Sequence, residues 1–290
     1  MATLEELRSS YPNIAADFTI PQRWEGYGAA EHGTWRMLFD RQLALLPGRA
    51  CGEFLDGLDK LKLVPDQIPD FERLSEQLTR LTGWRVVAVP SLVPDDVFFD
   101  HLANRRFPAG HFIRSLQQLD YIEEPDVFHD VFGHVPMLAH PVFADYMQAY
   151  GKGGQRALAE FGALKNLARL YWYTVEFGLI AQSDGMRIYG SGIVSSRAES
   201  VYAVESPSPN RIGFDLERVM RTEYRIDDFQ ESYFVISSFE ELFAETYKDF
   251  AALYTKLASG PVYKPGDVLG SDRVLTRGTH AYRAGSHTIS

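Results

Sequence analysis

Apolar side chains at steps of three and four residues recur along most of this chain, and they constrain its fold more than any other feature. The clearest segment opens at Pro69-Asp70 and stops at Gly83, with one apolar stripe between. Asp is a preferred N-cap residue and Gly commonly follows the last turn of a helix, so the sequence predicts a capped amphipathic helix here. The same periodicity predicts a helix over residues 239–258. We expect further helices over residues 34–46, 94–104, 126–133, 140–150 and 166–181.

Segments typical of strands are few and short. They are residues 84–89 (WRVVAV), 187–189 and 233–236, which are too short and scattered for a doubly wound sheet. From Ser259 onward the chain is rich in Gly, Ser, Arg and Pro and shows no periodicity. No internal repeat divides the rest. We therefore expect a mainly helical fold with small β elements, as one domain over residues 1–258 followed by an irregular tail over residues 259–290. No terminal oligomerisation helix is expected, which favours a monomer.

Charge and composition exclude several classes of protein. The 290 residues carry a net charge of -10 and no Lys/Arg run, so a nucleic acid partner is not expected. A single cysteine, Cys51, excludes a disulfide within the chain and a thiolate metal cluster. The first twenty residues lack the apolar stretch of a secretory signal, and no run of about 18 apolar residues exists. We expect a cytoplasmic protein that acts on small molecules without a membrane.

The segment EEPDVFHDVFGHVP, residues 123–136, places His129 and His134 five residues apart. Five residues of an α-helix turn through about 500°, which leaves the two side chains roughly 140° apart. The helix must therefore end or distort between them if both histidines bind one ion. Gly133 and Pro136 favour such a break. The zinc protease spacing H-E-x-x-H is not present.

A third ligand is suggested by Glu176, the only charged residue in the segment LYWYTVEFGLIA, residues 170–181. A buried carboxylate must meet a cation, be protonated or bind metal, because burying it unpaired is very costly. Two His and one carboxylate are typical of non-haem Fe(II) oxygenases. The residues alone leave open that the histidines are unrelated and that Glu176 forms a salt bridge. They also leave open a zinc hydrolase, since zinc accepts the same ligands.

From Trp84 to about Phe250 the sequence resembles the catalytic domain of the tetrahydropterin-dependent aromatic amino acid hydroxylases, especially the bacterial phenylalanine 4-hydroxylases. The matching pieces agree in order and spacing. They are Phe112-Ile113-Arg114, Tyr121, Glu124-Pro125-Asp126, residues 129–136, residues 171–179 and residues 189–196. The resemblance implies a single helical catalytic domain of that type, with His129, His134 and Glu176 as the iron ligands.

The resemblance also assigns substrate contacts. Arg114 would bind the amino acid carboxylate, for which a guanidinium fork is well suited, and Ser195 would support it. Pro125 and Trp172 would pack against the substrate ring. On the residues alone, Arg114 could equally be an ion-paired arginine and Trp172 a core residue. Asp126 lies one turn before His129 and could accept a proton from the second ring nitrogen of that histidine, or could instead cap the helix.

Cofactor contacts follow from the same resemblance. Phe98 would stack on the pterin ring and the loop from Val93 to Asp95 would touch its edge, while Asp130 and Tyr171 also match positions on the pterin side. Three residues depart from many animal members: Asp130 stands in place of glutamate, Asp95 in place of serine and Ile122 in place of threonine. No counterpart of the animal regulatory domain is seen, so allosteric activation by substrate is not expected.

The expected reaction is hydroxylation of L-phenylalanine to L-tyrosine by O2, with ferrous iron and tetrahydrobiopterin or a related tetrahydropterin. Val235 supports this choice, because tyrosine hydroxylases carry an aspartate at the matching position and phenylalanine hydroxylases a valine. Val235 could also be a plain core residue of a short strand. The alternatives are a tyrosine or tryptophan hydroxylase of the same family, a zinc hydrolase on the same ligands, and an inactive pterin or amino acid binding module.

Overall fold

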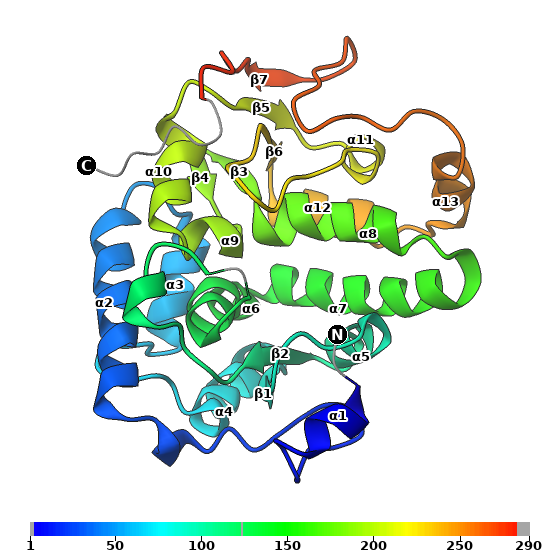
Figure 1. Ribbon diagram of the computed structural model, residues 1–290. Coiled ribbons are helices and arrows are strands. Elements are labelled where there is room, and N and C mark those ends of the chain that lie inside the picture. Colours follow the sequence, from blue (N-terminus) through cyan, green and yellow to red (C-terminus); the bar gives the residue numbers. More distant parts are fainter. Residues whose placement is uncertain (1–2, 123, 283–290) are drawn as a thin grey trace. The chain divides into compact units, whose positions relative to one another are not determined.

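The computed structural model describes residues 3–122 and 124–282. Glu123 of the histidine motif and the last eight residues of the expected tail lie outside this described part. The chain forms two compact units, one of residues 1–47 and 52–162 and the other of residues 48–51 and 163–290. Helices predominate and the strands are short, so the prediction of a mainly helical fold with small β elements is confirmed (Figure 1). The prediction of one domain over residues 1–258 stays a prediction.

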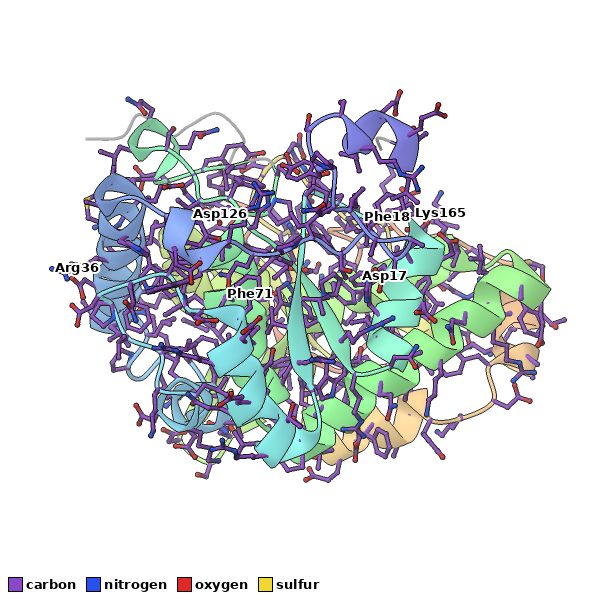
Figure 2. The ribbon with its side chains drawn as sticks, turned by 90° about the horizontal axis from the view of Figure 1, so that it is seen from below. Asp17, Phe18, Arg36, Phe71, Asp126 and Lys165 are labelled. Atoms are coloured by element: carbon purple, nitrogen blue, oxygen red, sulfur yellow. The ribbon has the colours of Figure 1, made fainter. Side chains whose placement is uncertain are left out.

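The first unit is built on a pair of parallel strands, β1 (Arg85–Val89) and β2 (Arg106–Gly110), in which Val86 pairs with Phe107. Helix α5 (Asp95–Ala103) connects them, and helix α4 (Phe71–Thr82) packs on β1. In Figure 2 the two strands run side by side next to α4, which begins at the labelled Phe71. The other helices of the unit are α1 (Leu4–Arg8), η1 (Trp24–Gly26), α2 (Ala29–Leu45), α3 (Gly52–Lys60), η2 (Leu116–Gln118), η3 (Phe128–His134), α6 (Val135–Leu138), α7 (Pro141–Arg156) and η4 (Ala157–Phe161).

Helix α4 has the ends that the sequence predicts. The Asp70 carboxylate accepts a hydrogen bond from the backbone N–H of Glu72 at 2.9 Å, which satisfies one of the free donors of the first turn. Gly83 follows the last turn in the left-handed conformation, with φ of 77°, where glycine carries no steric penalty. The apolar stripe then packs against β1 and buries Phe71, Leu74 and Leu78.

The second unit contains a five-stranded sheet in the order β4-β3-β6-β5-β7. The central strand β6 (Ser232–Ile236) is buried along its whole length and is parallel to both of its neighbours. The other strands are β3 (Leu179–Gln182), β4 (Gly185–Ile188), β5 (Asn210–Gly213) and β7 (Val274–Thr276). The helices are α8 (Leu164–Tyr171), η5 (Trp172–Glu176), α9 (Ser191–Val194), α10 (Arg197–Glu205), α11 (Leu216–Met220), α12 (Phe239–Thr246) and α13 (Ala251–Leu257).

Cys51 ends the short segment of residues 48–51, which belongs to the second unit although the residues before and after it belong to the first. Its backbone N–H donates to the carbonyl of Ile188 at 2.9 Å, at the end of β4. The thiol is fully buried, which agrees with a small packing residue. No helix in the described part of the chain combines the length and apolar character needed to cross a membrane.

Several expected elements differ in the structure. The predicted helix over residues 239–258 is two helices, because the chain leaves α12 after Thr246 and the Asp249 carboxylate caps the first N–H of α13, that of Ala251. The predicted helix over residues 166–181 ends at Glu176, and residues 179–182 form a strand. The tail that was expected to be irregular contains β7, which pairs with β5.

Candidate metal centre

His129 and His134 lie on one seven-residue π-helical segment, η3. The hydrogen bond of a π-helix closes five residues on, so side chains five apart are separated by about one turn and share a face. This accounts for a spacing that an α-helix does not tolerate. The sequence predicted an end or distortion, and the structure shows a widened turn that runs through Gly133 without a break. Pro136 lacks an N–H and removes the α-helical bond to the Phe132 carbonyl, which favours the wider turn.

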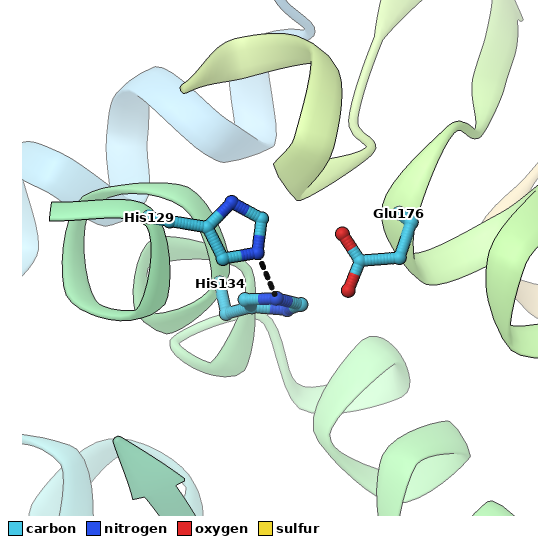
Figure 3. Close-up of side chains that lie close together, drawn as sticks. All are labelled: His129, His134 and Glu176. Atoms are coloured by element: carbon cyan, nitrogen blue, oxygen red, sulfur yellow. Dashed lines mark hydrogen bonds between the residues drawn. The ribbon is translucent and has the colours of Figure 1, made fainter. Parts of the chain in front are cut away.

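The two imidazoles face each other through their outer nitrogens. The Nε2 atoms are 3.2 Å apart and the rings are nearly perpendicular, at 82° (Figure 3). Imidazole binds first-row divalent ions at about 2.1 Å, so two neighbouring ligands of one ion lie about 3 Å apart. The observed spacing fits a pair of ligands on one metal ion. His134 is buried and its ring lies 4.9 Å from that of Phe107 on β2, which restricts its rotation.

A buried aromatic cluster fixes the backbone of η3. Phe128 and Phe132 stack on each other with centroids 4.7 Å apart. Phe132 also meets Phe39 of α2 and Phe54 of α3 edge-on, and Phe128 meets Trp35 of α2. Each such pair contributes about 0.5–1.5 kcal/mol beyond its buried area. The histidines are therefore carried on a segment whose other face is anchored in the core.

Helix α3 approaches the turn after η3 more closely than a side chain would permit. A Cβ atom at Gly57 would lie 2.2 Å from the carbonyl oxygen of Pro136. Only glycine allows the two backbones to pack at this distance. Gly57 thus helps to set where α6, and with it His134, is held.

Asp126 and Arg114 form a buried ion pair beside His129 (Figure 2 labels Asp126). The Asp126 carboxylate accepts from Nε and Nη2 of Arg114, both at 2.8 Å, and from the Arg114 backbone N–H at 2.9 Å. It also accepts from the backbone N–H of His129 at 3.0 Å. This bond to the backbone matches the helix-capping alternative for Asp126, and a bond from the ring nitrogen of His129 stays a prediction.

This ion pair has two electrostatic consequences. Burial opposes ionisation of Asp126, but the hydrogen bonds and charge of Arg114 outweigh it and hold the pKa of Asp126 below its ordinary value. Arg114 donates from Nε and Nη2 to Asp126. Its Nη1 makes no hydrogen bond to any residue in the described part of the chain. Asp126 thus engages one edge of the guanidinium fork, the edge formed by Nε and Nη2.

Glu176 is the last residue of a second π-helical segment, η5, and its side chain is half-buried. The segment closes with the N–H of Phe177 donating to the carbonyl of Trp172 at 2.8 Å. The hydroxyl of Ser191, at the start of α9, donates to Oε2 of Glu176 at 2.9 Å. The carboxylate of Glu176, which Figure 3 also draws, is thus held in a defined orientation by the hydroxyl of Ser191.

The remaining substrate candidates of the second unit occupy different settings. Trp172 opens η5 and donates its indole N–H to Gln230 at 2.9 Å. Ser195 is buried, and its hydroxyl donates to the Ser191 carbonyl at 2.7 Å. Val235 is the fourth of the five residues of β6 and has 1% of its surface exposed. It is a core residue of the sheet, and its role in substrate choice stays a prediction.

The pterin candidates are divided between the two units. Asp95 opens α5, and Phe98 packs one turn later against a cluster that includes Val93. Asp130 accepts a hydrogen bond from the N–H of Gly110 at 2.7 Å. Pro125 is half-buried just before η3, and Tyr171 ends α8.

Three residues at these sites were not predicted. Phe107 packs on His134, Ser191 donates to Glu176 and Gln230 accepts from Trp172. Ser191 and Gln230 lie 15 and 58 residues from their partners. No local pattern marks such pairs, so only the folded chain identifies them.

The family described as biopterin-dependent aromatic amino acid hydroxylase matches residues 3–263. The chain belongs to this family. The resemblance seen in the sequence is therefore confirmed.

Several members of this family are similar to the chain over most of its length. The phenylalanine-4-hydroxylase of Caulobacter vibrioides is 65% identical over 271 residues, which cover 93% of this chain and 92% of that protein. A crystal structure of Chromobacterium violaceum phenylalanine hydroxylase with bound iron(III) and 7,8-dihydrobiopterin is 60% identical, with a TM-score of 0.86 over 90% of this chain and 94% of that one. A second structure of the same enzyme, with iron and phenylalanine bound, is 59% identical, with a TM-score of 0.86 over 90% of this chain and 95% of that one.

Proposed function

We propose that this protein hydroxylates L-phenylalanine to L-tyrosine with O2, as a phenylalanine 4-monooxygenase that uses ferrous iron and a tetrahydropterin. The observation that carries the proposal is the pair of imidazoles on η3, whose Nε2 atoms are 3.2 Å apart. Such a pair supplies two neighbouring ligands to an ion with open positions. Relatives at 60–65% identity are named phenylalanine-4-hydroxylase, which favours this reaction over a zinc hydrolase or an inactive binding module.

In this proposal His129, His134 and Glu176 hold the iron. The two neutral imidazoles and one carboxylate leave part of the ion's charge uncompensated and several of its positions open. Ser191 keeps the carboxylate of Glu176 oriented through its hydrogen bond. Iron and tetrahydropterin, when bound, supply the activation of dioxygen, while the chain holds and orients them and excludes water.

Arg114 binds the carboxylate of the amino acid through the end of its fork that Asp126 leaves available. Because Asp126 holds the other edge at two points, the guanidinium is already oriented before the substrate arrives, which lowers the entropy cost of binding. Ser195 supports this contact. Pro125 and Trp172 pack against the substrate ring, and the apolar side chain of Val235 favours a ring without a hydroxyl group.

The tetrahydropterin stacks on Phe98 and touches Val93 and Asp95 along its edge, with Asp130 and Tyr171 on the same side. Asp130 is already bonded to the backbone of Gly110, so its position is fixed before the cofactor binds. We further propose that the protein is a cytoplasmic monomer that needs neither nucleic acid nor a membrane.

One assay tests the reaction. The protein is loaded with ferrous iron without oxygen, mixed with tetrahydropterin and L-phenylalanine, and exposed to air. We expect tyrosine in proportion to the pterin consumed, and none without iron or without pterin. Tyrosine formation with zinc in place of iron, or its absence under all conditions, would refute the proposal.

The iron ligands are tested by substitution. His129→Ala, His134→Ala and Glu176→Ala should each lose most bound iron while keeping the helical circular dichroism of the wild type. His32→Ala is the matched control, because this histidine accepts a backbone hydrogen bond from Ile68 at 3.1 Å and has no assigned part in the site. Full iron content in one of the three variants would remove that residue from the ligand set.

A further inference from the structure

Trp172 contacts two other aromatic rings. It stacks on Tyr224 with centroids 4.3 Å apart and planes 15° from parallel. It also contacts Phe177, at 4.7 Å and 34°. Stacking fixes the plane of the indole but allows it to slide and turn within that plane. A second interaction is needed to fix that in-plane orientation.

That interaction comes from Gln230, whose side-chain oxygen accepts the indole N–H at 2.9 Å. The side-chain nitrogen of Gln230 donates to the backbone carbonyls of Arg225 at 3.0 Å and of Asp228 at 3.4 Å. Both carbonyls can only accept and the indole N–H can only donate. The amide therefore has one orientation that satisfies all of its partners, and its oxygen must face Trp172.

The segment that carries Gln230 is itself anchored. The backbone N–H of Gln230 points to the buried carboxyl group of Glu199 at 3.5 Å, and the hydroxyl of Tyr233 donates to the same oxygen. The hydroxyl of Tyr282 donates to the carboxylate of Asp228 at 2.7 Å. Gln230 is 2% exposed, so water does not compete for its bonds. The acceptor offered to the indole is thus rigid.

We propose that Gln230 is a positioning residue of the hydroxylase site, which sets the in-plane orientation of Trp172 and through it the placement of the substrate ring. This inference rests on the proposed function, because it uses Trp172 as a contact of the phenylalanine ring. If the indole of Trp172 is held loosely, the phenylalanine ring that packs on it is in the wrong orientation for hydroxylation for part of the time. In that case we expect part of the pterin to be oxidised without formation of tyrosine.

The test is a double-mutant cycle with Gln230→Met and Trp172→Phe. Methionine has the length of glutamine but offers the indole no strong acceptor, and phenylalanine keeps a ring without an N–H. Gln230→Met should lower kcat/KM for phenylalanine about fivefold, the equivalent of one hydrogen bond of about 1 kcal/mol. It should also lower the tyrosine formed per pterin oxidised, while iron content and the KM for pterin stay unchanged. In the Trp172→Phe background the same change should have no further effect on this ratio.

A matched control separates positioning from general loss of stability. Gln22 makes a similar bridge, donating to the Pro69 carbonyl at 2.9 Å and accepting from the Phe71 N–H at 2.8 Å. Gln22→Met should lower the urea midpoint and leave the ratio of tyrosine to oxidised pterin unchanged. Additive effects in the cycle, or an equal loss of that ratio in Gln22→Met, would overturn the inference.

A second measurement decides the matter if Gln230→Met does not fold. The resonance Raman difference between the wild type and Trp172→Phe reports the state of the Trp172 N–H, which should be hydrogen-bonded with and without phenylalanine. A free indole N–H would overturn the inference. A wild type that makes no tyrosine would instead refute the proposed function, so the two failures are distinguishable.

Discussion

Glu199, the third residue of α10, should make the stability of this protein depend on pH in an unusual direction. Its side chain is 5% exposed and accepts from the hydroxyl of Tyr233. Burial raises the pKa of Glu199 from 4.5 to about 7, even though the hydrogen bonds from Tyr233 and Gln230 lower it in part. Below about pH 7 the carboxyl group in the folded protein is therefore largely protonated.

The size of the effect follows from linkage. Between pH 4.5 and about 7 the folded state binds the Glu199 proton and the unfolded state does not. The contribution of Glu199 to the free energy of unfolding is therefore full below about pH 4.5 and is lost as the pH rises through about 7. A shift of roughly 2.5 units at 1.36 kcal/mol per unit gives about 3 kcal/mol. Glu199→Gln removes this titration and keeps an acceptor for Tyr233.

The assay is urea unfolding at pH 5 and pH 8 with a chelator present, so that metal binding does not contribute. Relative to Glu199→Gln, the wild type should lose about 2–3 kcal/mol between the two pH values, because pH 5 already lies slightly above the ordinary pKa of a glutamate. Glu240→Gln is the control, because this exposed residue of α12 should leave the pH dependence of the wild type in place. Parallel pH curves for the wild type and Glu199→Gln would refute the reasoning, because Glu199 would then titrate as an exposed carboxyl group does.

Three further predictions follow from the sites. Arg114→Ala should cost about 2–5 kcal/mol of phenylalanine binding with little change in the KM for pterin. Phe98→Ala should raise the KM for pterin with little change in phenylalanine binding. Equal effects of either variant on both ligands would contradict the assignment of Arg114 to the substrate and Phe98 to the pterin. Val235→Asp should raise kcat/KM for tyrosine relative to phenylalanine, and unchanged ratios would remove Val235 from substrate choice. Gly57→Ala should destabilise the fold by about 1–3 kcal/mol in urea, because its methyl group would lie 2.2 Å from the Pro136 carbonyl oxygen, and a wild-type midpoint would show that the two backbones separate easily.

The sequence predicted those elements whose signals are local. Helix α4 has its cap, stripe and stop within fourteen residues, and the structure places its ends at Asp70 and Gly83 as expected. Strand β2 was missed because its sequence, RFPAG, contains a proline and a glycine and no alternation. It becomes a strand by pairing with β1, some twenty residues away, and such pairing leaves no mark in a short window.

The candidate site was predictable to a similar extent. The five-residue spacing of the histidines required a distorted helix, but the sequence did not reveal that two wide turns, η3 and η5, carry the three proposed ligands. The resemblance supplied the residues and the structure supplied their partners. Asp126 illustrates the limit, since its spacing to His129 allowed either a bond to the ring or a helix cap, and only the folded chain shows the bond to the backbone.

The wide turn of η3 makes the histidine pair sensitive to chain length in a way that substitutions do not reveal. Deleting one residue between His129 and His134 would give a spacing of four, which an ordinary α-helix presents on one face. The backbone would then relax to the commoner helix, and both imidazoles could still converge. Where the deleted residue is Asp130 or Val131, Phe128 and Phe132 would no longer share the register that seats them in the aromatic core. The segment must therefore satisfy two spacings at once, that of the two histidines and that of the two phenylalanines. A change of length that keeps the histidines on one face would disturb the packing of the phenylalanines in the core.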